Sequence, residues 1–175
     1  MSTAAKAARA IFERKLEDLR RESDEAQQMH RRQIALHARG SFDYDPRVHV
    51  AALSQTLQSL YTRAESILKD LLRAAGEEVP DTSAWHRDLL LLAATEQAGL
   101  RPSLISELER DGLGRLLAFR HAVRNAYTGE LRAEDVTRNG EEAFELLPKV
   151  IESLRAHVLW FFGDGKDGQG QAVKR

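Results

Sequence analysis

The densest group of side chains that could do chemistry lies in residues 119–127, with the sequence Phe-Arg-His-Ala-Val-Arg-Asn-Ala-Tyr. On a helix, Arg120, Arg124 and Tyr127 share one face because residues three or four positions apart are neighbours. His121 and Asn125 share the adjoining face. The planar guanidinium group of arginine gives a phosphate two parallel hydrogen bonds, and imidazole can move a proton near neutral pH. The cluster therefore predicts a site for a phosphate-containing substrate.

The same cluster also has a purely structural interpretation. In that interpretation His121 and Tyr127 are core residues whose polar atoms are satisfied by neighbouring groups. The two arginines then form ion pairs with nearby acidic residues, such as Glu107, Glu109 or Glu130. Residue types alone leave both interpretations open.

Other kinds of active site have weaker support. None of the six histidines has a glutamate three residues before it, and no His-Glu-x-x-His motif occurs, so the spacings of di-iron and zinc enzymes are missing. No serine lies in a Gly-x-Ser-x-Gly turn, and there is no cysteine to act as a nucleophile or as a thiolate ligand. We therefore expect no metal ion and no cofactor.

The composition restricts the class of protein. The 175 residues are 42% hydrophobic and 30% charged, and 26 basic against 27 acidic residues give a formal net charge of −1. This excludes a generally basic surface that coats nucleic acid, so any contact with nucleic acid must be a local site. The longest apolar run, residues 89–94, is far shorter than the ~20 residues that span a bilayer. Without cysteine or a secretory signal, we expect a cytoplasmic protein with no membrane contact.

Apolar periodicity predicts an all-α protein of about five to six helices, with no alternating strand pattern. Residues 3–39 contain no proline or glycine and predict one long N-terminal helix. The apolar stripe of this helix weakens after Leu19, so we expect its second half to meet solvent or a partner. Asp45 followed by Pro46 predicts the start of a second helix, and Gly76 predicts its end.

Shorter helices are predicted for the rest of the chain. A third begins near Ser83 and ends before Gly99, a fourth runs from Pro102 to residues 111–112, and a fifth covers residues 113–128. A last apolar stripe over residues 143–161 contains Pro148, which either kinks one helix or separates two. We therefore expect residues 1–39 to form the long N-terminal helix, residues 45–162 a helical bundle, and residues 163–175 a flexible tail.

Three segments in this order resemble landmarks of one protein family: residues 83–90 (SAWHRDLL), residues 100–106 (LRPSLIS) and residues 119–127 (FRHAVRNAY). Together they make residues 48–162 similar to the HEPN superfamily, and in particular to HepT-like toxins of prokaryotic toxin–antitoxin systems. The resemblance implies a HEPN-like helical bundle and a metal-independent ribonuclease that acts as a homodimer. It also implies a reaction in which the ribose 2′-hydroxyl of RNA attacks the adjacent phosphorus. The long N-terminal helix is not covered by the resemblance.

The family's active site is an arginine followed, after about four to six residues, by a histidine, and HepT-like members add a tyrosine two residues after it. In this sequence Arg120 matches the arginine and Tyr127 matches the tyrosine, while Asn125 occupies the position of the histidine. The resemblance implies that Arg120 and Arg124 bind RNA phosphate. It also implies that an MNT-type nucleotidyltransferase antitoxin attaches AMP to Tyr127 and so silences the toxin.

Asn125 departs from the family's motif, since an amide can bind a phosphate but cannot serve in proton transfer. His121 is a candidate for that role, so the catalytic candidates are Arg120, His121 and Asn125. A second register of the motif pairs Arg115 with His121 but loses the tyrosine match. Two further residues of the resemblance are interpreted as packing and capping residues: Trp85 and His86.

Whether the chain is an enzyme stays open at this point. The leading hypothesis is an endoribonuclease toxin regulated by a nucleotidyltransferase antitoxin. The alternatives are a catalytically inactive HEPN subunit that binds a nucleotidyltransferase, and an unrelated helical adaptor.

Overall fold

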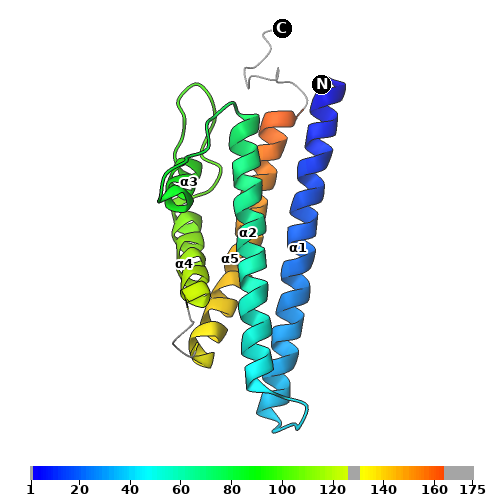
Figure 1. The fold of residues 1–175 in the computed structure, drawn as a ribbon. Helices are drawn as coiled ribbons and strands as arrows, with labels where there is room; N and C mark the ends of the chain where they lie inside the picture. Colours follow the sequence, from blue (N-terminus) through cyan, green and yellow to red (C-terminus); the bar gives the residue numbers. More distant parts are fainter. Residues whose placement is uncertain (1, 126–130, 164–175) are drawn as a thin grey trace.

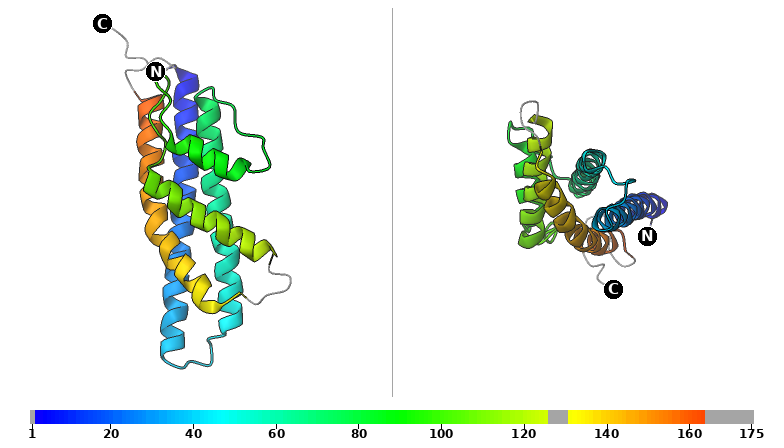
Figure 2. Two further views of the ribbon diagram at one scale, coloured as in Figure 1. Left: turned by 90° about the vertical axis from the view of Figure 1, so that its left-hand side faces the viewer. Right: turned by 90° about the horizontal axis from the view of Figure 1, so that it is seen from below.

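The computed structural model describes residues 2–125 and 131–163. These residues form five helices: α1 (Thr3–Ala38), α2 (Pro46–Ala74), α3 (Trp85–Ala94), α4 (Glu107–Asn125) and α5 (Ala133–Phe162). The long helices α1, α2 and α5 pack side by side, and α3 and α4 lie against one side of them (Figure 1). Figure 2 shows α4 slanting across α2 and α5. The predicted all-α bundle with a long N-terminal helix is confirmed.

Local signals set the boundaries of α1 and α2. The Ser2 hydroxyl accepts a hydrogen bond from the Ala5 N–H at 3.1 Å and caps α1. The Asp45 carboxylate accepts one from the Arg47 N–H at 2.8 Å, and Pro46 is the first residue of α2. Gly76, with a φ of +81°, follows the last turn of α2 in the left-handed conformation that glycine favours. Both helices therefore end within a residue or two of their predicted limits.

The connection between α3 and α4 differs from the prediction, because no helix begins at Pro102. Residues 95–106 form an irregular connector instead, and a buried arginine holds it in place. The Arg101 guanidinium group pairs with Glu77 and donates hydrogen bonds to the carbonyl oxygens of Leu92 and Thr95, each at 3.0 Å. These carbonyl groups belong to the end of α3. Arg101 supplies hydrogen bonds to them and thereby fixes the path of the chain towards α4.

The prediction of two helices in residues 102–128, separated at residues 111–112, is also wrong, because α4 continues through both positions. α4 begins with a capping box in which the Ser106 N–H donates to Glu109 at 2.7 Å and the Glu109 N–H donates to the Ser106 hydroxyl at 3.2 Å. Gly112 lies where α4 approaches α5, and a Cβ atom there would be 2.7 Å from the Leu146 side chain. This glycine permits close packing and does not end the helix. Residues 126–128 lie outside the described residues.

The last helix is continuous, with Pro148 inside it, so of the two predicted outcomes the single helix is found. α5 packs along α1, and the rings of Phe12 and Phe162 stack with centroids 5.6 Å apart. The second half of α1 was expected to meet solvent or a partner, but up to residue 30 its stripe is buried within the bundle, as Ser23 and His30 show. The reason is that α2 and α5 both extend along this part of α1.

No helix in the described ranges is both long enough and apolar enough to span a membrane. Residues 164–175, which make up almost all of the tail predicted from the sequence, lie outside the described residues.

Candidate functional site

An open groove runs between the start of α3 and the C-terminal half of α4. Its volume is about 590 Å³, and its lining includes Ser83 and Arg87 on one side and Gly114 and Ala118 on the other. Two imidazole groups from different helices also line it: His86 of α3 and His121 of α4. Their ring centroids are 5.9 Å apart and the rings are almost perpendicular. The groove thus brings together two groups that can transfer protons.

A buried carboxylate of α2 holds one of these imidazoles. The Glu65 side chain is only 4% exposed, and its Oε1 is hydrogen-bonded to His86 Nδ1. The same oxygen accepts a hydrogen bond from the Tyr61 hydroxyl at 2.9 Å. When Glu65 is ionised, His86 Nδ1 is the donor, which leaves Nε2 as the nitrogen able to accept a proton. His86 Nε2 makes no hydrogen bond within the described part of the chain.

Tyr61 supports this arrangement as a permanent donor. Burial raises the pKa of the Tyr61 hydroxyl above its ordinary value, and the charge of Glu65 and its hydrogen bond raise it further. The positive charge of Arg120 acts in the opposite direction but is the smallest of these effects. Tyr61 therefore stays protonated and keeps donating to Glu65.

Arg120 is half-buried and reaches from α4 towards α2. Its Cζ atom lies 6.0 Å from the centre of the Tyr61 ring, at the distance of a cation–π contact. Its Nη1 atom is buried and has no hydrogen-bond partner among the residues described. Leaving a buried donor unpaired costs about 1–3 kcal/mol, so a ligand that brings an acceptor, such as a phosphate oxygen, would be favoured at this position.

The ion pairs expected from the structural interpretation of the cluster do not form where the chain is described. Glu109 accepts hydrogen bonds from Ser106 and, at 2.8 Å, from the Ser153 hydroxyl of α5, and it does not contact Arg120. Neither Arg120 nor Arg124 makes an ion pair within residues 2–125 and 131–163. Glu130, the third acid considered, lies outside these ranges.

The other residues predicted for the site lie on α4 or beyond its end. His121, Arg124 and Asn125 are exposed, and Asn125 is the last residue of α4. Tyr127 lies outside the described residues, so its position relative to the groove stays a prediction. Arg115, the alternative motif arginine, pairs with Glu142 of α5 at 3.0 Å, and neither it nor Arg120 is among the residues that line the groove.

Sequence reasoning missed two members of the site and assigned a third to packing. Tyr61 and Glu65 were not considered, and His86 was interpreted as a packing or capping residue. The available signal was the position of Glu65, four residues after Tyr61 and three before Leu68, which places a carboxylate on the buried face of α2. A carboxylate on such a face needs a partner, and here the partner is an imidazole from α3.

No group of three or more His, Cys, Asp or Glu residues that could hold a metal ion occurs among the described residues. Two imidazoles line the groove, and behind them lie the Glu65 carboxylate, which bonds His86 and Tyr61, and the Arg120 guanidinium group, which contacts the Tyr61 ring. These groups can transfer protons and stabilise negative charge on a phosphate.

A family model described as HepT-like protein matches residues 52–161, which is more than half of the chain. The matched stretch contains every residue of the groove and its support, whereas α1 and the loop that follows it lie outside. A search of curated proteins and a search of solved structures each gave no match.

Proposed function

The chain belongs to the HepT-like family of HEPN-type proteins, and from this premise we propose that it is an endoribonuclease toxin that cleaves RNA without a metal ion. One observation carries the proposal. Arg120, which has an unpaired guanidinium N–H, contacts the ring of Tyr61, and Tyr61 donates to the buried Glu65 carboxylate that holds His86 against His121 in the groove. This set supplies a phosphate-binding group and two proton carriers, although Asn125 stands at the motif's histidine position.

In the proposed reaction the ribose 2′-hydroxyl of RNA is the nucleophile. The 2′-oxygen forms a bond to the adjacent phosphorus, its proton passes to one imidazole, and the bond between phosphorus and the 5′-oxygen breaks. A second, protonated imidazole gives its proton to the leaving 5′-oxygen. The products are a 2′,3′-cyclic phosphate and a free 5′-hydroxyl.

We assign the base to His86, because Glu65 orients its ring and stabilises the imidazolium that forms when it takes the proton. His121 is then the acid that protonates the leaving oxygen. Arg120 and Arg124 stabilise the extra negative charge on the phosphate oxygens in the transition state.

The proposal includes a symmetric homodimer formed through the side of the bundle that carries α3 and α4. Each of these helices exposes a large apolar residue, Leu91 of α3 at 56% and Leu108 of α4 at 82%. A two-fold dimer through this side would bring two grooves together and double the positive charge offered to RNA. Light scattering should give the mass of a dimer, and a monomer at micromolar concentration would argue against this part of the proposal.

The proposal also includes control by a nucleotidyltransferase antitoxin that attaches AMP to Tyr127. Tyr127 follows Arg124 by three residues in the sequence, so the adduct would bring negative charge near the cations proposed to bind RNA. Intact-mass measurement after co-expression with the antitoxin should show the adduct on the wild type and not on Tyr127→Phe. An adduct that persists in Tyr127→Phe would place the modification elsewhere.

The direct test is cleavage of a labelled single-stranded RNA in the presence of EDTA, with the product ends identified by mass spectrometry. We expect 2′,3′-cyclic phosphate ends, and Arg120→Ala should lower the rate about 10²–10³-fold. Arg115→Ala is the matched control, because Arg115 is on the same helix but pairs with Glu142. A requirement for added divalent metal would contradict the mechanism.

A second function is favoured by one observation, the amide of Asn125 at the motif's histidine position. In this alternative the protein is an inactive HEPN subunit that binds a nucleotidyltransferase. A wild-type protein that fails to cleave any RNA tested, yet forms a stable complex with the nucleotidyltransferase, would support it.

A further inference from the structure

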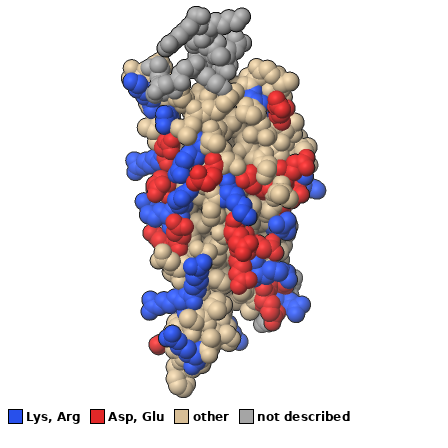
Figure 3. Space-filling model, turned by 180° about the vertical axis from the view of Figure 1, so that it is seen from behind, with Lys and Arg blue, Asp and Glu red and all other residues tan. Residues whose placement is uncertain are grey.

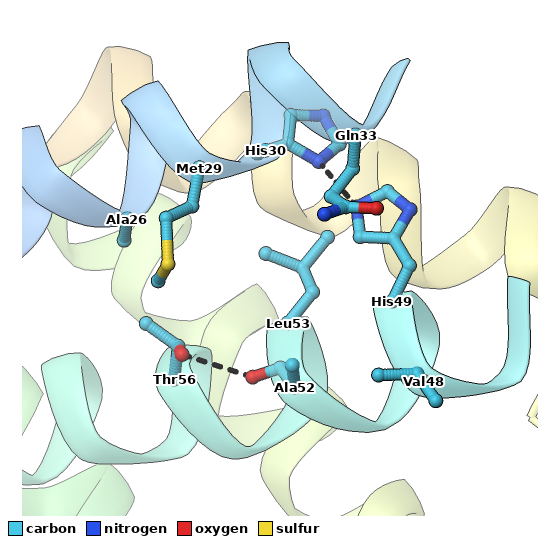
Figure 4. A pocket seen from close by; sticks show the side chains of 9 residues that line it. All are labelled: Ala26, Met29, His30, Gln33, Val48, His49, Ala52, Leu53 and Thr56. Atoms are coloured by element: carbon cyan, nitrogen blue, oxygen red, sulfur yellow. Dashed lines mark hydrogen bonds between the residues drawn. The ribbon is translucent and has the colours of Figure 1, made fainter. Parts of the chain in front are cut away.

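The hairpin end of the bundle, where α1 passes into α2, takes no part in the proposed RNA site. A small pocket of about 100 Å³ opens there between the two helices (Figure 4). Met29 and Val48 stand at its walls, Ala52 lines it, and the paired rings of His30 and His49 border one end. Six of the nine lining residues precede residue 52, so most of this surface lies outside the family match.

The seam between α1 and α2 is closed by polar contacts over the half that lies away from the hairpin. Lys15 Nζ is 2.6 Å from an Asp70 carboxylate oxygen. Further along, Glu22 accepts a hydrogen bond from the Ser59 hydroxyl at 2.7 Å and pairs with Arg63 at 2.5 Å. On that half, ionic and hydrogen-bonded side chains therefore connect the two helices.

Towards the hairpin the same seam becomes apolar and open. No ion pair joins α1 to α2 beyond Glu22 in the described residues, and the exposed fractions of Met29 and Val48 are 60% and 65%. Ile34 and Phe42, at 38% and 108%, add to the exposed apolar surface of this end. Met29 and Val48 are exposed apolar residues that line one pocket, and such residues indicate an interaction site.

The same end carries an excess of positive charge. Residues 26–56 contain four arginines and two aspartates, a balance of +2 in a chain whose net charge is −1. None of the four arginines forms an ion pair within the described ranges, and all four are exposed: Arg31, Arg32, Arg39 and Arg47. In Figure 3 the charged residues at this end of the molecule are mostly blue, whereas red and blue residues are mixed above it. The partner of this surface should therefore be acidic.

One helix of the molecule already packs against His30 with an apolar side chain and neighbouring carboxylates. On the other side of His30, α5 presents Phe144, whose ring centroid is 5.8 Å from that of His30. Glu141 and Glu145, on the same turn of α5, line a pocket with His30 and Arg31. An apolar side chain flanked by glutamates is thus a helix surface that fits this part of α1.

We propose that the pocket docks an amphipathic helix of a partner protein, with an aliphatic side chain in the pocket and carboxylates facing the arginines. A volume of about 100 Å³ is two-thirds of the roughly 150 Å³ cavity that admits benzene, so it suits an aliphatic side chain and is too small for a nucleobase. The partner is therefore a protein and not RNA. The inference does not depend on RNA cleavage.

The probe is a synthetic peptide of about 18 residues, long enough to form a helix, with leucines on one face and glutamates on the other. Its counterpart carries lysines in place of the glutamates. Fluorescence anisotropy should show binding of the Leu/Glu peptide with a Kd at least about tenfold lower than that of the Leu/Lys peptide. Absence of binding, or equal binding of the two peptides, overturns the proposal.

Two adjacent exposed alanines of α2 give matched variants, because Ala52 lines the pocket and Ala51 does not. Ala52→Glu should weaken the Leu/Glu peptide about tenfold or more, while Ala51→Glu should leave its Kd unchanged. Arg32→Glu should reduce or reverse the difference in Kd between the Leu/Glu peptide and the Leu/Lys peptide. Thermal unfolding of each variant shows whether the helices remain intact.

Two competing occupants give distinct results. If the pocket binds a second copy of the chain, sedimentation velocity shows assemblies larger than a dimer that Ala52→Glu removes. If it binds RNA, single-stranded RNA displaces the Leu/Glu peptide and Ala52→Glu weakens RNA binding. Either result overturns the proposal of an acidic helix.

Discussion

Two pairs of histidines lie in different surroundings. In the groove, His86 is bonded to the buried carboxylate of Glu65, and its partner His121 is exposed. At the hairpin end, His30 Nδ1 lies 3.1 Å from His49 Nε2, and both residues are buried. In the second pair one imidazole must donate to the other, so that hydrogen bond needs at least one neutral ring.

The surroundings, more than the residue type, decide what each pair can do. Burial lowers the pKa of His30, although the charge of Glu141 acts in the opposite direction. Burial also lowers the pKa of His49, and positive charge on His30 or on His37 would lower it further. The hairpin pair therefore stays neutral and packs, whereas the Glu65 carboxylate orients His86 and leaves its Nε2 without a hydrogen-bond partner among the described residues.

The strongest test of this contrast replaces one histidine of each pair. His86→Asn should lower RNA cleavage about 10²–10⁴-fold, because it removes the proposed proton carrier. His49→Asn should leave the cleavage rate per folded molecule unchanged, and its folded fraction can be measured by circular dichroism. Equal losses in the two variants would mean that the groove histidine has no special role.

A smaller effect is expected when the ring is kept and its support is altered. Glu65→Gln retains an oxygen that can accept the His86 Nδ1 proton but removes the negative charge, so the rate should fall about 10–100-fold. A rate equal to that of the wild type would show that the negative charge of Glu65 is not needed for cleavage.

Asn125→His sharpens the question of whether the groove already has its proton carriers. If His86 and His121 supply them, a third imidazole should change the cleavage rate less than about tenfold, well below the 10²–10⁴-fold that a missing acid or base is worth. A gain of about a hundredfold would show that the wild-type groove lacks a carrier and would favour the inactive subunit.

The hairpin pair of histidines should affect the free energy of unfolding and not the rate of RNA cleavage. In the unfolded chain, His30 and His49 bind protons as the pH falls below about 6.5, the ordinary pKa of histidine. In the folded chain the pKa of each is lower, so they bind protons only at lower pH. The free energy of unfolding should therefore be highest above about pH 6.5 and fall below it. Urea unfolding across this range measures the effect, which should be weaker in His30→Asn/His49→Asn and unchanged in His121→Asn.

Much of the fold could be predicted because its signals are local. Asp45 and Pro46 mark the start of α2 and Gly76 its end within the sequence itself. The role of Gly112, by contrast, is set by Leu146, more than thirty residues further along the chain, so a local rule took it for a helix end. Packing between helices determines whether such a glycine ends a helix or allows close contact. The apolar periodicity of a single helix carries no information on this packing.

The candidate site also combines residues that the sequence could predict with contacts that it could not. Arg120 and His121 could be found because they are neighbours on one helix. The bond from Glu65 to His86 joins residues 21 positions apart on different helices, and the sequence alone gives only a carboxylate on an apolar face.

The stack of Phe12 on Phe162 has a consequence for the order of events during synthesis. The first helix leaves the ribosome with its apolar face uncovered, and the residues of α5 that cover it are made last. At roughly 5–20 residues per second, on the order of ten seconds separates the two aromatic rings. The complete bundle can therefore form only after nearly the whole chain has been made. The proposed ribonuclease activity is delayed equally, so a partner protein synthesised earlier can already be present when the activity arises.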